Sequence, residues 1–243
     1  DMGLGKTVQT IMALPEKDSC AALVVVPASL KYNWKKELEK WRPELSVSII
    51  SNEKSFRLPT FGEVVIANYE NLPAYLEPHK ISATSKPWEL MVTWPNNFMR
   101  DHSKNVTLIV DEAQRVKNYK TKRSKRIKGL AMSAKNVWGL TGTPLENRPE
   151  DLYGILESLQ MQMKVFGGWT KFVGYMNGNK NRWGGYEWGR PSPIVPELLR
   201  RVMLRRKREE VLPDLPNKTY SYHKVALPVE LRTHMDDLWS KYS

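Results

Sequence analysis

The sequence predicts an α/β fold: a mostly parallel sheet with helices on both faces and a glycine-rich loop at its edge. Short apolar runs such as Ala22–Val26 alternate along the chain with helical patterns. That alternation is the order a parallel α/β sheet requires, and runs without polar residues indicate strands covered on both faces. The glycine-rich loop Asp1–Thr7 precedes the first helical pattern. Because ligands of such sheets bind at the carboxyl ends of the strands, we expect the site at that edge.

The composition narrows the class of protein. The 243 residues are 41% hydrophobic, which is enough for a sizeable core. No apolar run approaches membrane-spanning length and no signal peptide is visible, so we expect no membrane partner. Cys20 is the single cysteine, which excludes an internal disulfide and fits a reducing compartment. We therefore expect an intracellular protein, in the nucleus if its source is eukaryotic and in the cytoplasm if it is bacterial or viral.

The opening loop has the pattern of a phosphate-binding loop. Gly5, Lys6 and Thr7 match the end of G-x-x-x-x-G-K-[ST]. Glycines let backbone N–H groups crowd around phosphates, the lysine reaches the β- and γ-phosphates, and the threonine hydroxyl can hold Mg²⁺. The predicted nucleotide-contacting residues are Gly3, Leu4, Gly5, Lys6, Thr7 and Val8. The first small residue of the pattern falls just before Asp1, so we expect the preceding strand to be absent and the chain to be a piece of a longer protein.

The first elements follow from the loop and from hydrophobic spacing. Thr7–Leu14 is predicted to be a helix whose N-terminal dipole points at the phosphates. Ala22–Val26 is the next strand, and Pro27 ends it. Ser29 can cap the helix that follows. That helix has one apolar face, formed by Trp34, Leu38 and Trp41.

The remaining strands and helices repeat the same signals. Further strands are expected at Val47–Ile50, Val64–Ala67, Val106–Val110 and Val137–Leu140. Residues 71–104 are proline-rich and irregular, which predicts an insertion or a surface loop. A helix follows the last strand, with Pro149 tolerated in its first turn. Its apolar face is formed by Leu152, Ile155, Leu156 and Leu159.

The net charge of +12 is concentrated in two stretches. Arg115–Lys128 holds eight basic residues and no acid, and Arg200–Arg208 holds six more basic residues. Localised positive charge is typical of a surface that binds a polyanion. A solvated helix face is the alternative, and charge runs often end that way. Because a nucleotide site is also predicted, we favour a nucleic acid as partner.

One segment interrupts the α/β pattern. Phe166–Arg190 contains seven glycines and almost no periodicity. Its tryptophans, Trp169, Trp183 and Trp188, are interleaved with Lys171, Lys180, Arg182 and Arg190. These rings could stack on unpaired bases. The reading we favour is that they pack an irregular surface segment onto the domain.

Two adjacent carboxylates end the strand before the basic run. Leu108–Val110 is apolar, and Asp111 and Glu112 follow it directly. Nucleotide hydrolysis needs one carboxylate to position Mg²⁺ and another to orient or deprotonate the attacking water. We assign Asp111 and Thr7 to the metal, Glu112 to the water, and Lys6 to the phosphates as a third catalytic residue. The alternative is a strand that ends in two solvated acids, and the phosphate loop on the same predicted sheet argues against it.

Longer stretches of the sequence resemble one family. Asp111-Glu112-Ala113-Gln114 looks like the DEAD/H-box of superfamily-two helicases, with glutamine in the fourth place. The surrounding segments narrow the resemblance to the SWI/SNF-like DNA translocase ATPases. In the family's order, they are DMGLGKTVQT, VVVPASLKYNWKKELEKW, VVIANYE, DEAQRVKN, LTGTPLENRPEDLYGIL and MLRRKREEVLPDLPNK.

This resemblance implies a RecA-like P-loop NTPase lobe that lacks its first strand and binds ATP and Mg²⁺. It agrees with the roles given above to the loop and to the two carboxylates. It also implies that four residues link the nucleotide state to the DNA-bound state: Gln114, Thr141, Gly142 and Thr143. Gln114 stands where the family has histidine, which is the clearest departure of this sequence from the family pattern.

The resemblance further implies duplex DNA as a partner. The residues expected near the phosphates of one DNA strand are Pro27, Ser29, Asn33, Asn68 and Tyr69. Trp34 lies among them, but its helical spacing makes core packing its main role. Within the basic run, we expect Lys117, Lys120 and Arg123 to contact or steer toward DNA, with binding that weakens steeply as salt rises.

The resemblance also implies a division into parts. Residues 1–198 would form the first ATP-binding lobe, with irregular segments at 71–104 and 166–190, and residues 199–219 would form a linker or brace between lobes. Residues 220–243 would begin the second RecA-like lobe of the full-length chain, with a strand at Tyr220–Leu227 and a helix at Val229–Lys241. Since the second lobe supplies an arginine that completes the site, we expect these 243 residues alone to hydrolyse ATP barely at all.

The function predicted from the sequence is an ATP-dependent DNA translocase or remodeller. Such a motor would move along duplex DNA and rearrange protein–DNA or branched-DNA structures. A strand-separating helicase or the motor of a restriction complex is one alternative. A non-hydrolysing scaffold that keeps the fold for DNA binding is another, although a scaffold has no need of Lys6, Thr7, Asp111 and Glu112 together.

Overall fold

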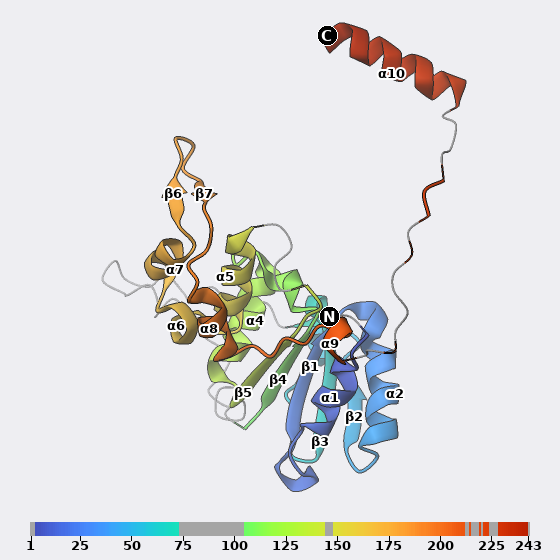
Figure 1. The fold of residues 1–243 in the computed structure, drawn as a ribbon. Coiled ribbons are helices and arrows are strands. Elements are labelled where there is room, and N and C mark those ends of the chain that lie inside the picture. The colour runs from blue at the N-terminus through green and yellow to red at the C-terminus, as the bar shows by residue number, and fades with distance from the viewer. Residues whose placement is uncertain are drawn as a thin grey trace. The chain divides into compact units, whose positions relative to one another are not determined.

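The structure is a computed structural model that describes residues 3–72, 105–143, 148–211, 214, 219, 221–223 and 228–242. It divides into two compact units, Asp1–Arg208 and Glu209–Ser243. The first unit contains the sheet, the phosphate loop and the acidic pair (Figure 1). The second unit is described mainly by one helix.

In the described part of the chain, the main sheet has five parallel strands in the order β2-β3-β1-β4-β5. Their bounds are β1 Ala21–Val26, β2 Ser46–Ile49, β3 Glu63–Asn68, β4 Thr107–Asp111 and β5 Asn136–Leu140. The five strands predicted from apolar runs are thereby confirmed. Because neighbouring strands are parallel, their carboxyl ends lie at one edge of the sheet.

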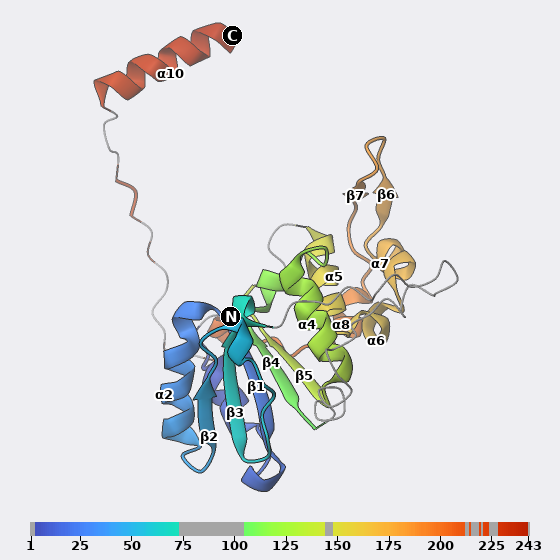
Figure 2. The same cartoon turned by 180° about the vertical axis from the view of Figure 1, so that it is seen from behind.

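Helices cover both faces of this sheet, as predicted (Figures 1 and 2). Residues 22, 24 and 26 of β1 pack in one core cluster with Ile11 of α1 and Trp34 of α2. Residues 23 and 25 pack in a second cluster with Ile127 of α4 and Ile155 of α5. The bounds of these helices are α1 Lys6–Met12, α2 Lys31–Trp41, α4 Lys122–Ser133 and α5 Pro149–Ser158. β1 is fully buried because its successive side chains point alternately into the two core clusters, which lie on opposite faces of the sheet.

Five further helices are described. They are α6 Gln162–Phe166, α7 Trp169–Tyr175, α8 Val195–Arg200, α9 Arg208–Val211 and α10 Val229–Tyr242. Single 3₁₀ turns lie at Lys17–Ser19, Ala28–Leu30, Glu53–Ser55, Tyr69–Asn71 and Ala113–Val116. Within the described ranges, no helix is long and apolar enough to cross a membrane.

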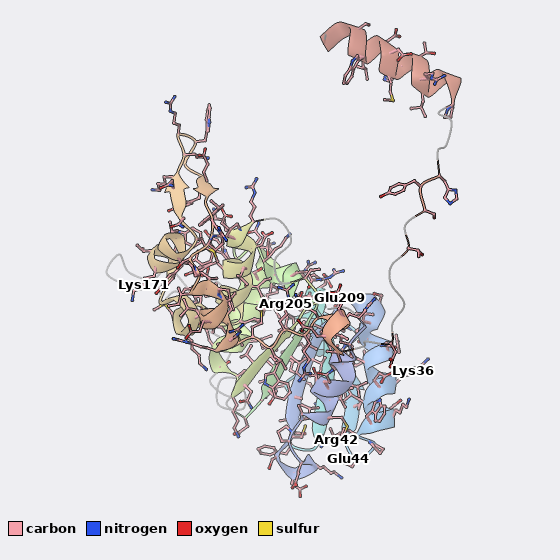
Figure 3. All side chains as sticks on the ribbon, viewed as in Figure 1. Lys36, Arg42, Glu44, Lys171, Arg205 and Glu209 are labelled. Carbon is pink, nitrogen blue, oxygen red and sulfur yellow. The ribbon has the colours of Figure 1, made fainter. Side chains whose placement is uncertain are left out.

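A charged residue beyond α2 ties this helix to α1. The Arg42 guanidinium donates hydrogen bonds to the carbonyl oxygens of Leu14 (3.0 Å) and Pro15 (2.8 Å). It also pairs with the Glu44 carboxylate, next to which it lies in Figure 3. The chain that leaves the phosphate loop is therefore held against the helix that follows β1.

Two details of α2 differ from the prediction. Ser29 does not cap the helix, because it lies inside the 3₁₀ turn Ala28–Leu30 and no side chain caps the helix start. Trp41 does not join the apolar face: it is 41% exposed, and its indole N–H donates to the Glu37 carboxylate at 2.9 Å. Trp34 and Leu38 are buried as expected. The apolar face ends one turn early because α2 extends past the edge of the core.

The segment from Phe166 to Arg190 is not irregular, which corrects the sequence-based expectation. It contains the end of α6, all of α7, and an antiparallel hairpin of β6 Gly178–Lys180 and β7 Tyr186–Trp188. Strands of three residues are too short to show a period, and this is why the pattern was invisible.

The expected elements near the C-terminus are tested only in part. α10 confirms the helix predicted at Val229–Lys241. Of the strand predicted at Tyr220–Leu227, only 221–223 are described, and they have no regular structure; the rest lies outside the described residues. Residues 73–104 of the predicted insertion also lie outside them.

Candidate nucleotide-binding and hydrolysis site

The phosphate loop lies at the start of α1, in a backbone conformation that favours glycine. Gly3 has φ of 77° and Gly5 has φ of 69°, both in the left-handed region. The Gln9 backbone N–H donates to the Gly5 carbonyl oxygen (3.0 Å), and the Gln9 side-chain amide donates to the Leu4 carbonyl oxygen (2.6 Å). The loop is thus closed by the helix it begins. Lys6, Thr7 and Val8 follow in the first helical turn, half-buried.

Asp111 is the last residue of β4, and two donors hold its carboxylate. The residue is only 7% exposed. The Trp34 indole N–H donates to Oδ2 at 2.8 Å, and the Glu112 backbone N–H donates to Oδ1 at 2.9 Å. Burial raises the pKa of Asp111, while the Trp34 hydrogen bond and the positive charge of Lys6 oppose that rise. The influence of Lys6 links the phosphate loop and the acidic pair electrostatically.

The site offers the ligands that Mg²⁺ prefers. Magnesium takes oxygen ligands and usually keeps several waters and substrate phosphates, so one or two protein oxygens suffice. The Asp111 carboxylate accepts one hydrogen bond on each oxygen, which leaves further lone pairs on both. Asp111 therefore has the acceptor capacity that a magnesium ligand needs, and Thr7, in the first turn of α1, carries the hydroxyl predicted as a second ligand. Within the described residues, no cluster of three or more histidine, cysteine or acidic side chains forms an all-protein metal site.

A chain of side-chain hydrogen bonds starts at Glu112. Gln114 Nε2 donates to Glu112 Oε2 at 2.6 Å, and the Thr141 hydroxyl donates to Gln114 Oε1 at 2.7 Å. The Thr143 backbone N–H in turn donates to the Thr141 hydroxyl oxygen at 3.1 Å. The turn after β5 is therefore joined to the acidic pair at the end of β4. Gly142 lies within this turn, half-buried.

In this series of hydrogen bonds, the side-chain amide of Gln114 acts both as a donor and as an acceptor. One side-chain amide donates through its nitrogen and accepts through its oxygen, so it can bridge a carboxylate and a hydroxyl. Glu112 is held in the left-handed region, with φ of 51°, which is uncommon for a residue with a side chain. Its carboxylate is consequently directed by the backbone and anchored by Gln114. Gln114 replaces the family's histidine and still bridges Glu112 and Thr141.

Tyr69 has a supporting position that sequence reasoning missed. It is 1% exposed, and its hydroxyl donates to the Asp111 carbonyl oxygen at 2.5 Å. Burial is also the main cause that raises the pKa of Tyr69, so the phenol stays protonated and remains a donor. The signal available in the sequence was its place directly after β3, at the same edge of the sheet as Asp111.

The residues predicted to meet DNA phosphates divide by exposure. Pro27, Asn68 and Tyr69 are buried, and their placement near DNA phosphates stays a prediction. The Asn68 side chain donates to the Glu70 carboxylate at 2.9 Å. Ser29 and Asn33 are exposed near the start of α2.

The basic run is divided between ion pairs and solvent. Lys117 pairs with Asp151 at 3.3 Å, and Arg123 pairs with Glu70 at 2.8 Å. Lys120 is exposed. Two more lysines, Lys122 and Lys125, are exposed on α4. Among described residues these three lysines form no ion pair, which makes them more accessible to a polyanion than Lys117 and Arg123.

The second basic stretch, Arg200–Arg208, contacts the phosphate loop and the helix that follows it. Arg206 Nη1 donates to Gln9 Oε1 at 3.0 Å. The Arg208 guanidinium lies so near Gly3 that a Cβ added there would come within 2.9 Å of Nη2. Within this segment Met203 is half-buried, whereas Leu204 is 76% exposed. This segment therefore brings positive charge to the loop where phosphates are predicted.

Comparison with known proteins agrees with this geometry. A family model described as the SNF2-related domain matches residues 1–234. The human "DNA annealing helicase and endonuclease ZRANB3" is 33% identical over 99% of this chain, which spans 22% of that protein. The "Putative ATP-dependent helicase/translocase YwqA" of Bacillus subtilis is 30% identical over 95% of this chain, which spans 23% of it.

Solved structures show the same fold. The "Sulfolobus solfataricus SWI2/SNF2 ATPase core domain" covers 89% of this chain with a TM-score of 0.56 and 26% identity. The same core in complex with dsDNA gives a TM-score of 0.59 at 24% identity. The chain spans 40% and 41% of those two chains, respectively. The RecA-like lobe expected from the sequence is confirmed.

Proposed function

The chain belongs to the SNF2-related family, and we propose that it forms the ATP-binding lobe of a motor that moves along duplex DNA and rearranges protein–DNA or branched-DNA structures. Its curated relatives carry the names of ATP-dependent helicases and translocases, which supports a DNA-dependent motor in general. The observation that carries the finer proposal is the hydrogen-bonded chain from Glu112 through Gln114 to Thr141.

The residues of the site supply distinct parts of the hydrolysis. Lys6 and the loop N–H groups would hold the phosphates, and Thr7 and Asp111 would hold Mg²⁺. The ion supplies charge neutralisation of the phosphates when bound. Glu112 orients the attacking water or takes its proton. Removal of a general base of this kind costs typically a factor of about 10²–10⁴ in rate.

The chain of hydrogen bonds gives a physical route from chemistry to DNA. A change at Glu112 on hydrolysis alters what Gln114 can accept and donate, and so alters its bond to the Thr141 hydroxyl. The exposed lysines of residues 120–125 follow the same acidic motif along the chain. Contacts to phosphates are independent of base sequence, as a motor that tracks DNA requires.

The proposed motor needs more than this chain. The 243 residues span about a fifth of the curated relatives named above. We expect a second RecA-like lobe of the full-length protein to complete the site with an arginine. Loss of such an arginine typically costs about 10³–10⁵ in rate, so these residues alone would turn over ATP very slowly.

The test compares two substitutions at Thr141 in the full-length protein. Thr141→Val keeps the shape but removes the hydroxyl that donates to Gln114, whereas Thr141→Ser keeps the hydroxyl. We expect Thr141→Val to bind ATP normally and to lose most of the stimulation of ATPase activity by duplex DNA. Thr141→Ser should retain that stimulation. Equal stimulation in both variants would contradict the coupling route.

A further inference from the structure

The hairpin of β6 and β7 projects from the helices α6–α8, away from the main sheet (Figures 1 and 2). Its strands pair from Gly178 opposite Trp188 to Lys180 opposite Tyr186. Neither the description of the matching family nor the names of the relatives gives this hairpin a role. Its two ends differ: the base is packed against α7, and the tip is exposed.

The base of the hairpin is rigid because aromatic rings lock it to α7. Trp188 stacks on Tyr186 at 5.3 Å between ring centroids and meets Trp169 and Phe172 edge-on at 6.2 and 5.7 Å. Phe172 is fully buried. A Cβ on Gly178 would come within 2.6 Å of the Trp188 ring, so strand and ring are in close contact. These contacts fix the direction in which the hairpin points.

The tip is organised by one side chain. The Asn181 Oδ1 accepts hydrogen bonds from the backbone N–H groups of Trp183 (3.1 Å) and Gly185 (2.8 Å). The Asn181 backbone N–H donates to the Gly185 carbonyl oxygen at 3.0 Å, which closes the loop. Gly184 has φ of 78°, a conformation that other residues rarely adopt. The loop is therefore shaped before any partner arrives.

This organised loop presents a tryptophan to solvent. Trp183 is 92% exposed, and in the described part of the chain no other ring contacts it. A side chain so exposed buries almost no apolar area and contributes little to folding. Packing, the reading favoured from the sequence, explains Trp169 and Trp188 but not Trp183. An exposed tryptophan on a rigid turn is a feature of binding surfaces.

Positive charge lies along the hairpin: Lys180 and Arg182 are next to the tip, and Arg190 is at the base, where its carbonyl oxygen accepts from the Asn177 amide. Between Gly178 and Arg190 there are three basic residues, Lys180, Arg182 and Arg190, and a single acid, Glu187. All three basic residues are exposed. Lys171 adds a fourth exposed cation on α7, which carries the hairpin (Figure 3). The surface thus combines one free aromatic face with charges that attract a polyanion.

We propose that the β6–β7 hairpin binds unpaired DNA bases where a duplex opens into single strands. Aromatic stacking with flanking cations is how proteins hold unpaired nucleotides, because each base has a free face and each link a phosphate. Bases inside a duplex have no free face, so Trp183 distinguishes a junction from uninterrupted duplex. This inference rests on the proposed function: the lobe moves along the duplex, and the hairpin recognises its opened end.

The experiment uses the full-length protein without nucleotide and two fluorescent DNA probes, a fork with unpaired arms and a duplex of equal length. Variants are Trp183→Ala, Trp183→Phe and the exposed Trp41→Ala on α2 as a matched control. Stacking on one base is typically worth an affinity factor of roughly 5 to 150. We expect Trp183→Ala to lose fork affinity by such a factor, and to keep its duplex affinity and melting temperature. Trp183→Phe should retain most fork affinity, and Trp41→Ala should match the parent protein.

Three results would overturn the inference: fork affinity unchanged in Trp183→Ala, equal losses on fork and duplex, or no fork preference in the parent protein. Failure of the proposed function has a separate signature, since duplex DNA would then not stimulate the ATPase. Fork binding that depends on Trp183 would still support the hairpin site in that case.

Discussion

At the scale of single residues, the site depends on side chains that lie far from it in sequence. Asp111 is oriented by Trp34, 77 positions earlier, and its carbonyl oxygen is held by Tyr69, 42 positions earlier. Sequence reasoning assigned Trp34 to core packing, which its burial confirms, but a helical spacing says nothing of the indole N–H. A hydrogen-bond donor behind a metal ligand fixes the direction in which that ligand points.

Replacing Trp34 tests this support. Trp34→Phe keeps a buried ring and removes the N–H that donates to Asp111 Oδ2. Removing a residue that orients a metal ligand typically costs about 10–100-fold in metal affinity. We expect the Mg²⁺ concentration for half-maximal ATPase activity of the full-length protein to rise by such a factor.

The same helix provides the control for that experiment. Trp41→Phe removes an indole N–H that donates to the Glu37 carboxylate and not to Asp111. Its Mg²⁺ dependence should match that of the parent protein. An unchanged Mg²⁺ dependence in Trp34→Phe, with ATPase activity retained, would show that Asp111 does not need this donor.

At the scale of elements, β3 begins with a buried carboxylate that joins it to β2. Glu63 accepts hydrogen bonds from Arg57, from the Ser48 hydroxyl of β2 (2.9 Å) and from the Thr60 backbone N–H (3.3 Å). The Arg57 hydrogen bonds are the main cause that lowers the pKa of Glu63 to about 2. The folded protein therefore binds this proton less readily than the unfolded chain does.

This carboxylate predicts an acid-sensitive stability. Because its folded pKa is depressed, its contribution is complete above the unfolded pKa of about 4.3 and is lost as pH falls toward about 2. Arg57 is half exposed and screened, so the contribution is on the order of 1–2 kcal/mol. Glu63→Gln should lower the melting temperature at pH 7. The difference in melting temperature between the variant and the parent protein should be smaller at pH 3 than at pH 7. A constant difference across this range would contradict the assignment.

The start of α4 carries the second prediction for an element. Lys120, Lys122 and Lys125 are exposed without ion pairs among the described residues, whereas Lys128 binds Glu157 at 2.7 Å. We expect the triple change of the first three to alanine to weaken duplex binding for all sequences. It should also reduce the slope of log affinity against log salt by about 0.9 for each DNA phosphate that the protein no longer neutralises.

Lys128→Ala serves as the comparison for the lysine variant. It removes one positive charge from the same helix, but a charge already held by an acid. Its salt slope should equal that of the parent protein. If both variants had the parent's slope, the lysines of residues 120–125 would lie off the DNA path.

Prediction from sequence succeeded where the pattern is local. β1, β3 and β4 were found because unbroken apolar runs are typical of strands buried on both faces, and the acidic pair was placed because β4 ends at Asp111. The hairpin at 178–188 was missed because three-residue strands show no period. The pairing of Lys117 and Arg123 with acids was equally hidden, since their partners lie on other elements.

At the scale of the whole molecule, the parallel sheet explains why distant motifs act together. The order β2-β3-β1-β4-β5 brings the ends of β3, β4 and β5 to one edge. Asn68, Asp111 and Leu140 are the last residues of those strands, and Tyr69 and the turn of residues 141–143 follow directly. Membership of the SNF2-related family and the geometry of this edge point to the same chemistry.

The most direct test of the account is the ATPase activity of the full-length protein with duplex DNA, single-stranded DNA, forked DNA and RNA. Glu112→Gln provides the blank, because it should bind ATP but not hydrolyse it. We predict strong stimulation by duplex and forked DNA, and none by RNA. Stimulation by RNA alone, or normal turnover by Glu112→Gln, would contradict the account.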